Sequence, residues 1–243
     1  MIKKINEELL NLWDGEHKKG SKELTQRWPL LFQEHVPSST DVLFVGINPS
    51  YDVEFLSTVC KGKSPEVMFK WEGIDASREK EIMGIERVIL DASKNGGEGA
   101  HSYHTAIKNL MEGVGSYNQI DLFPVRETDH RVLKAFIKCH SEFFKSLLNL
   151  WSEAVLYINP RLIVVVSAMA AHILDPDWEN EYRAIHPHGL IHPSGQALKG
   201  NFNRFFGKKN IPVVFSGMLS GGAIDVYSRE RLCLSIINAL KNG

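Results

Sequence analysis

Residues 42–50 read Val-Leu-Phe-Val-Gly-Ile-Asn-Pro-Ser, an apolar run that breaks into glycine, asparagine and proline. The first four residues are apolar on both faces of an extended chain, which is typical of a buried strand in a parallel sheet. Gly46 and Pro49, on either side of Asn48, then indicate that the strand ends in a turn or loop. Ligands of open α/β sheets bind at the carboxyl ends of the strands. The stretch therefore predicts a first strand that leads into a ligand-binding loop.

Three later runs predict further strands, and helical patterns separate them. The strands are expected at Gln119–Phe123, where Pro124 ends the run, at Leu162–Val166 and at Pro212–Phe215. The helices are expected within 1–35, at Arg78–Ala92, Thr105–Met111, 130–157, Met169–Leu174 and Arg231–Leu240. Strands that alternate with helices predict an α/β fold, a three-layer α/β/α sandwich with a central, mainly parallel sheet of about four strands. No linker or repeat divides residues 1–243, so we expect a single domain with a helical N-terminal lead-in over 1–35.

Composition narrows the functional classes. The chain has a formal net charge of −1 and is 43% hydrophobic and 23% charged, so any nucleic-acid binding must depend on a local basic patch. No apolar run approaches the roughly 18–20 residues that cross a bilayer, and the first residues lack the apolar core of a secretory signal. We therefore expect a cytoplasmic protein that does not bind membranes.

The three cysteines, Cys60, Cys139 and Cys233, lie far apart in the sequence. They form no C-x-x-C pair, which argues against a zinc ribbon or a redox dithiol. An all-cysteine iron–sulfur cluster takes four thiolates. We expect no cofactor and no iron–sulfur cluster.

A second segment, His192-Pro193-Ser194-Gly195, has the same character as the first loop. Gly46-Ile47-Asn48-Pro49-Ser50 after the first strand, together with His-Pro-Ser-Gly near the last, resembles the two signature loops of the uracil-DNA glycosylase superfamily. The closest likeness is to its mismatch-specific and single-strand-selective branches. The resemblance covers two short loops and the strand order over residues 40–216. It implies a DNA glycosylase that hydrolyses the N-glycosidic bond of uracil or a related damaged base.

The resemblance also implies the catalytic pair. Asn48 would orient the attacking water, but an amide cannot accept a proton as a carboxylate does. Stabilisation of the departing base would then supply most of the acceleration. His192 is the residue expected to donate a hydrogen bond to a carbonyl oxygen of that base.

The same resemblance implies a base pocket and a DNA-binding loop. The first loop and its surroundings would bind the substrate through Gly46, Ile47, Pro49, Ser50, Tyr51, Phe55 and Asn118. Phe55 would stack on the flipped base and Asn118 would read its edge, with Asp121 as a competing assignment. The second loop would bind DNA through Pro193, Ser194, Gly195, Leu198, Lys199 and Arg204, with Leu198 as a wedge in the base stack.

The sequence departs from the family in ways that concern the base. The most efficient branch has aspartate where Asn48 stands, and a tyrosine directly after the proline that excludes the methyl group of thymine. In this chain Ser50 follows Pro49, and Tyr51 comes one place later. Such a pocket would admit bases substituted at C5, unless Tyr51 closes the gap.

Structural interpretations remain open for several of these residues. The first loop alone is compatible with a simple strand-to-helix connection, Phe55 and Leu198 with ordinary apolar packing, and Asn118 with a turn. The charges of 199–209 are compatible with a solvated face. His186, His188 and His192 have the short spacing of zinc ligands, but His101 and His104 are remote from them in the sequence, and we expect no metal site.

Two other functions compete with the glycosylase hypothesis. One is a catalytically weak or inactive member of the same fold that binds nucleic acid or nucleobases. The other is a hydrolase of small nucleosides. DNA is the expected partner in the leading interpretation, and we expect the protein to act as a monomer.

Overall fold

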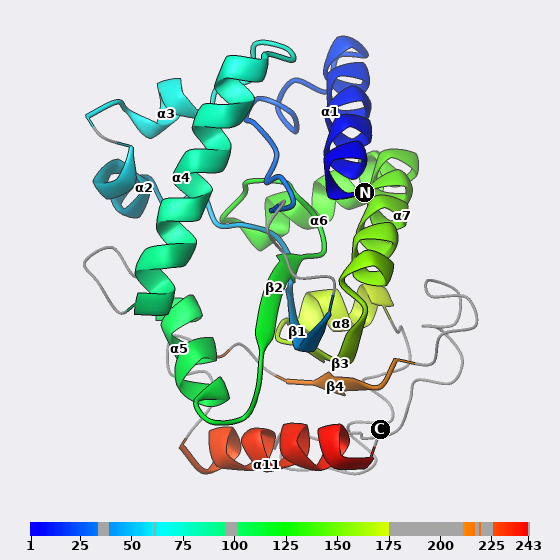
Figure 1. The fold of residues 1–243 in the computed structure, drawn as a ribbon. Coiled ribbons are helices and arrows are strands. Elements are labelled where there is room, and N and C mark those ends of the chain that lie inside the picture. Colours follow the sequence, from blue (N-terminus) through cyan, green and yellow to red (C-terminus); the bar gives the residue numbers. More distant parts are fainter. Residues whose placement is uncertain are drawn as a thin grey trace. The chain divides into compact units, whose positions relative to one another are not determined.

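The apolar runs form the strands of a parallel sheet. In the computed structural model, β1 (Thr40–Gly46), β2 (Tyr117–Asp121), β3 (Pro160–Val165) and β4 (Val213–Phe215) lie in the order β2-β1-β3-β4 (Figure 1), and every pair is parallel. The structure describes residues 1–33, 39–60, 62–95, 102–174, 211–216, 219 and 226–242. The predicted fold class, an α/β sandwich around a parallel sheet of four strands, is confirmed.

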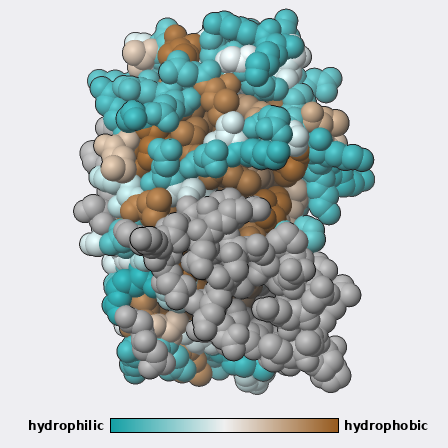
Figure 2. All heavy atoms as spheres, turned by 90° about the vertical axis from the view of Figure 1, so that its right-hand side faces the viewer, coloured by the Kyte–Doolittle hydropathy of each residue, from teal (hydrophilic) through white to brown (hydrophobic). Residues whose placement is uncertain are grey.

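The helices occupy most of the remaining described chain. They are α1 (Ile2–Lys18), α2 (Val53–Val59), α3 (Pro65–Met68), α4 (Ala76–Asn95), α5 (Ser102–Met111), α6 (His130–Cys139), α7 (Ser141–Ile158), α8 (Ala168–Leu174) and α11 (Val226–Asn242). None of these helices is long and apolar enough to cross a membrane. Figure 2 shows hydrophilic side chains over much of the described surface on one face, with hydrophobic side chains between them.

The chain divides into two compact units, each built from three separate segments. We call Met1–His35, Asn48–His104 and Phe123–Ala154 the helical unit, and Val36–Ile47, Thr105–Leu122 and Val155–Gly243 the sheet unit. Whether the two units make up the single domain expected from the sequence stays a prediction.

In the sheet unit, the two inner strands are apolar on both faces. Val42 to Val45 of β1 and Leu162 to Val165 of β3 have no exposed surface, as expected for a parallel sheet covered on both sides. Both α8 and α11 contact β3. At the amino end of β1, Asp41 accepts hydrogen bonds from the Ser116 amide (2.9 Å) and hydroxyl (2.8 Å). The strand β2 follows Ser116 directly and lies two residues earlier than the sequence predicted, at 117–121 instead of 119–123.

In the helical unit, tryptophan rings fill the core. Trp13 of α1 packs against Phe143 of α7 with ring centroids 5.7 Å apart, and Trp28 meets Trp71 at 4.8 Å. The segment after α1 contains no helix up to residue 33, and its Phe32 exchanges two hydrogen bonds with the Asn6 side chain. The helical lead-in predicted over 1–35 therefore ends at Lys18.

The single long helix predicted over 130–157 is wrong, because the chain breaks at His140. His140 has φ −120° and ψ 42°, outside the helical range, and separates α6 from α7. The Nδ1 atom of its ring lies 3.0 Å from a carboxylate oxygen of Glu16 in α1. The break rotates α6 relative to the predicted apolar stripe, so that Leu133 is fully buried while Val132 and Phe136 are only half-buried.

Candidate functional site

The chain reaches the surface within four residues of the end of β1. Gly46 ends the strand opposite Asp121 of β2, and the Leu122 amide donates to the Gly46 carbonyl over 3.0 Å. Ile47 is buried with 5% of its surface exposed. Asn48 and Pro49 are half-buried and Ser50 is exposed. We call residues 48–51, which begin the second segment of the helical unit, the Asn48 loop.

The Asn48 side chain binds the main chain of a second loop. Its amide nitrogen Nδ2 lies 2.9 Å from the Val125 carbonyl oxygen, 2.5 Å from that of Glu127 and 3.2 Å from that of Pro49. Three carbonyl acceptors around one atom fix it as the nitrogen, since an oxygen there would have no donor. The amide oxygen Oδ1 therefore points elsewhere, and no described residue donates to it. We call residues 125–128 the Glu127 loop.

A hydroxyl group makes a second tie between the two loops. Thr128 Oγ1 accepts a hydrogen bond from the Tyr51 amide over 3.0 Å and lies 3.2 Å from the Ser50 hydroxyl. Because Asn48 and Tyr51 stand at the two ends of the Asn48 loop, the Glu127 loop holds it at both ends. Such double anchoring reduces the number of conformations that the loop can adopt.

A buried ion pair joins the Glu127 loop to α4. Arg126 and Glu86 of α4 are 4% and 7% exposed and form a salt bridge. The Arg126 Nε donates to the Trp28 carbonyl over 3.0 Å, and its guanidinium lies over the Phe69 ring. The Arg126 carbonyl in turn accepts a hydrogen bond from Arg27. Buried charges must be paired and hydrogen-bonded to be tolerated, and these contacts meet that need.

Tyr51 packs into the interior of the helical unit. Its ring lies beneath the Arg27 guanidinium, 3.9 Å from ring centroid to Cζ, and meets the Phe69 ring edge-on at 6.2 Å. Burial raises the pKa of the Tyr51 phenol, and the nearby Arg27 charge lowers it by less. With Tyr51 held in this way, Ser50 and not Tyr51 forms the surface beside Pro49.

The Glu127 loop leads directly into α6. Asp129 is the N-cap of this helix, and its carboxylate accepts from the Arg131 amide over 2.8 Å and pairs with the Arg131 guanidinium. The Arg131 side chain and amide lower the pKa of Asp129 to about 2. The Asp129 amide donates to the Glu127 carboxylate over 2.8 Å. The start of α6 is therefore fixed next to the Asn48 loop.

The remaining predicted residues occupy separate positions. Phe55 lies in the first turn of α2, where its side chain is half-buried and its amide donates to the Asp52 cap. Asn118 of β2 pairs in register with Leu43, three residues before the strand's carboxyl end. Asp121 is the β2 residue at that end and pairs in register with Gly46. The base-reading role of Asn118, with Asp121 as the competing assignment, stays a prediction.

The second signature loop lies outside the described residues. This applies to every residue assigned to it, namely His192, Pro193, Ser194, Gly195, Leu198, Lys199 and Arg204. Their roles stay predictions from the sequence. Within the described ranges, no group of three or more His, Cys, Asp or Glu residues is placed to hold a metal ion.

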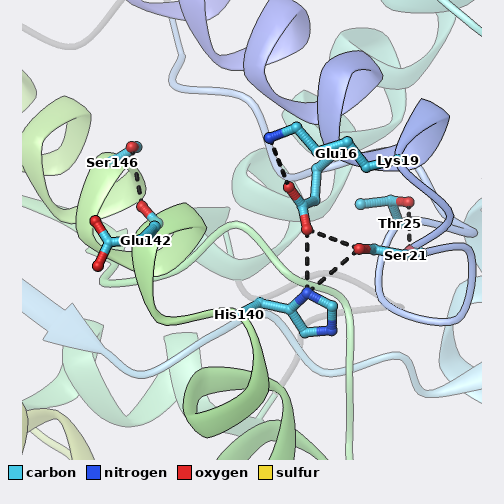
Figure 3. A network of polar contacts seen from close by, with 7 residues as sticks. All are labelled: Glu16, Lys19, Ser21, Thr25, His140, Glu142 and Ser146. Carbon is cyan, nitrogen blue, oxygen red and sulfur yellow. Dashed lines mark hydrogen bonds and ion pairs between the residues drawn. The ribbon is translucent and has the colours of Figure 1, made fainter.

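A second polar network in the helical unit joins the end of α1 to the break between α6 and α7 (Figure 3). The Ser21 hydroxyl donates to Glu16 Oε1 over 2.7 Å, and His140 Nδ1 lies 3.0 Å from the same oxygen. Ser21 Oγ is also 3.3 Å from this Nδ1. In a catalytic triad the serine and the carboxylate contact opposite ring nitrogens. Here both contact Nδ1, so the network anchors chain segments and is not a triad.

The sequence reasoning missed Arg126, Glu86 and Thr128. A signal for the buried pair does exist, because Glu86 stands four residues after Ile82 and three before Ile89, which are both buried on α4. A glutamate on the apolar face of a helix is rarely buried unless it is paired, so the pattern predicts a buried cation as its partner. No local pattern marks Thr128, whose role depends on the distant Tyr51 amide.

Comparisons of the chain with protein-family models, with curated proteins and with solved structures found no match.

Proposed function

We propose that this protein is a DNA glycosylase that releases uracil or a related damaged base, with Asn48 orienting the attacking water. The observation that carries the proposal is the state of the Asn48 amide. Its Nδ2 is held by main-chain carbonyl oxygens, and no described residue donates to its Oδ1. A fixed acceptor at the end of a parallel strand is suited to position a water molecule for reaction.

The chemistry of an amide defines the kind of enzyme. Hydrolysis of an N-glycosidic bond passes through an oxocarbenium-like sugar and leaves negative charge on the base. Asn48 can hold the water but cannot remove its proton, so general-base catalysis is weak in this proposal. Donors to the departing base must then carry the acceleration. His192 is the candidate from the sequence for that role.

The position of Ser50 bears on the choice of base. Because Tyr51 is held in the core by Arg27 and Phe69, its ring does not reach over the exposed Ser50. A small exposed side chain beside Pro49 leaves room for a substituent. The proposal therefore includes bases that carry a group at C5, in addition to uracil.

The direct experiment is a base-release assay. Purified protein, in excess over substrate, is incubated with oligonucleotides that contain uracil, a C5-substituted uracil, hypoxanthine or a mismatch, and alkali then cleaves any abasic site. We expect strand scission with at least one substrate and none after Asn48→Ala at the same incubation time. Intact strands with every substrate would overturn the proposal.

One observation favours a second function, a binding module without base release. The Nδ2 contacts of Asn48 already explain why an asparagine stands there, since they hold the Glu127 loop in place. In that case the protein would bind DNA or free bases, and Asn48→Ala would lower stability with no activity to lose. Binding to the same oligonucleotides without any scission would support this function over the first.

A further inference from the structure

The exposed face of α6 carries positive charge and no negative charge. The sequence of α6 contains His130, Arg131, Lys134 and Lys138 and no acidic residue. All four side chains are exposed. At 100° per residue they fall within about a quarter of the helix circumference, and the centre of this sector is about 110° away from the buried Leu133. We call these four residues the basic stripe.

Two cations of the stripe lack carboxylate partners. Arg131 is paired with Asp129, but Lys134 and Lys138 form no ion pair with any described residue. Elsewhere on the described surface several lysines are neutralised, as Lys63 is by Glu81 at 2.5 Å and Lys145 by Glu142 at 2.6 Å. For a chain with a net charge of −1, this is a local excess of positive charge.

Both ends of α6 are fixed, so the stripe has a defined place. At its start, Asp129 caps the helix, and Thr128 holds the Asn48 loop. At its end, the His140 amide donates to the Phe136 carbonyl over 2.8 Å, and the His140 ring is held by the Glu16 network (Figure 3). The stripe therefore begins beside the Asn48 loop and extends along α6 for about 12 Å at 1.5 Å per residue.

We propose that the basic stripe binds the phosphate backbone of DNA next to the Asn48 loop. Lys134 and Lys138 are one helical turn apart, about 6 Å along the axis, and lysine side chains are long enough to follow successive phosphates. Contacts of this kind position nucleic acid without reading its sequence. A strand lying on α6 continues toward the Asn48 loop, where the proposed function places the sugar of the target nucleotide. The inference rests on that function for the orientation of the strand.

The test measures binding to DNA that contains no damaged base. Fluorescence anisotropy of a labelled single strand, and of its duplex, is recorded for the wild type and for Lys134→Gln/Lys138→Gln between about 50 and 200 mM salt. We expect the variant to bind about tenfold more weakly at the lower salt concentration. Each lost phosphate contact lowers the slope of log K against log salt by roughly 0.7–0.9, so the slope should fall by about 1.5.

The matched control removes two exposed lysines that also lack ion pairs. Lys3 of α1 and Lys80 of α4 meet that description among the described residues. Lys3→Gln/Lys80→Gln changes the net charge by the same amount and should bind within twofold of the wild type. Equal binding by all three proteins, equal losses in both variants, or no binding by the wild type would each overturn the inference.

The same proteins separate this inference from the proposed function. If the Lys134/Lys138 variant binds weakly and the wild type releases no base, the stripe is a DNA-binding surface and the glycosylase proposal fails. If the wild type releases base and the variant binds as well as the wild type, the glycosylase proposal stands and the stripe inference fails. Thermal unfolding of both variants shows that they are folded, since exposed lysines away from packing contacts change stability little.

Discussion

The side-chain nitrogen of Asn48 lies 2.5 Å from the main-chain oxygen of Glu127, 79 residues later in the sequence. The residue that the sequence marks as catalytic therefore also holds together the Asn48 loop and the Glu127 loop of the helical unit. A side chain with both roles should respond differently to substitutions that preserve its shape and to those that remove it.

Asn48→Asp should destabilise the protein more than Asn48→Ala does at neutral pH. The alanine variant loses hydrogen bonds to three carbonyl oxygens, at a cost of about 1–2 kcal/mol. The aspartate variant loses the same bonds and also places a carboxylate oxygen against those carbonyl oxygens, which raises the pKa of the new carboxyl group. Urea unfolding of both variants at neutral pH measures the difference.

The difference between these variants should shrink as the pH falls toward the ordinary pKa of aspartate, about 4. A protonated carboxyl group can donate one hydrogen bond to a carbonyl oxygen, so acid relieves the repulsion. Equal stabilities of the two variants across this range would show that Nδ2 does not face the Glu127 loop.

Thr128→Val should cost about 1 kcal/mol of unfolding free energy, because it removes the acceptor of the Tyr51 amide while keeping the shape of the side chain. Ser50→Ala is the matched control, since it removes only the exposed contact between the two hydroxyl groups. We expect the control to stay within about 0.5 kcal/mol of the wild type. Thermal or urea unfolding measures the unfolding free energy of both variants. A larger loss of unfolding free energy in Ser50→Ala than in Thr128→Val would contradict the double anchoring.

Glu86→Gln should lower the unfolding free energy by about 3 kcal/mol or more, because it leaves the buried Arg126 guanidinium without its counter-charge. A double variant, Glu86→Gln/Arg126→Met, removes both charges and should lose less than the sum of the two single variants. A double-mutant cycle from urea unfolding measures this coupling. Strictly additive losses would mean that the pair does not interact in solution.

Asp41→Asn tests the anchor at the amino end of β1. The Ser116 amide and hydroxyl, and then Arg161, hold the pKa of Asp41 below its ordinary value of 3.8. A lowered pKa stabilises the fold above that value, and the contribution is lost as the pH falls through the pKa of the folded state. The wild type should therefore be more stable than Asp41→Asn near neutral pH, and the gap should close below about pH 4. A gap that is constant from neutral to acid pH would contradict this assignment.

The strands were predictable because the apolar residues that bury each strand lie within the strand itself. Val42–Val45 and Leu162–Val165 are apolar on both faces, and the structure buries them in the centre of a parallel sheet. The break at His140 was not predictable from the local pattern, and the Glu16 side chain that contacts His140 there is 124 residues away in the sequence. Without that partner the apolar periodicity runs on, and one long helix is the reasonable expectation.

For the candidate site, the sequence located the loop but not the contacts. Glycine and proline around Asn48 marked the end of a strand, and the structure places Asn48 two residues after β1. The carbonyl oxygens that bind its side chain belong to residues 125 and 127, and any residue type offers such an oxygen. Main-chain acceptors leave no signature in a sequence, so the second role of Asn48 becomes visible only in the fold.

The most direct measurement of the central claim is the single-turnover rate of base release from a uracil-containing single strand, compared between the wild type and Asn48→Ala. If Asn48 Oδ1 orients the attacking water, the rate should fall by roughly 10²–10³, while anisotropy shows unchanged binding of the uncleaved strand. A rate in Asn48→Ala equal to that of the wild type, or no base release by either protein, would contradict the claim.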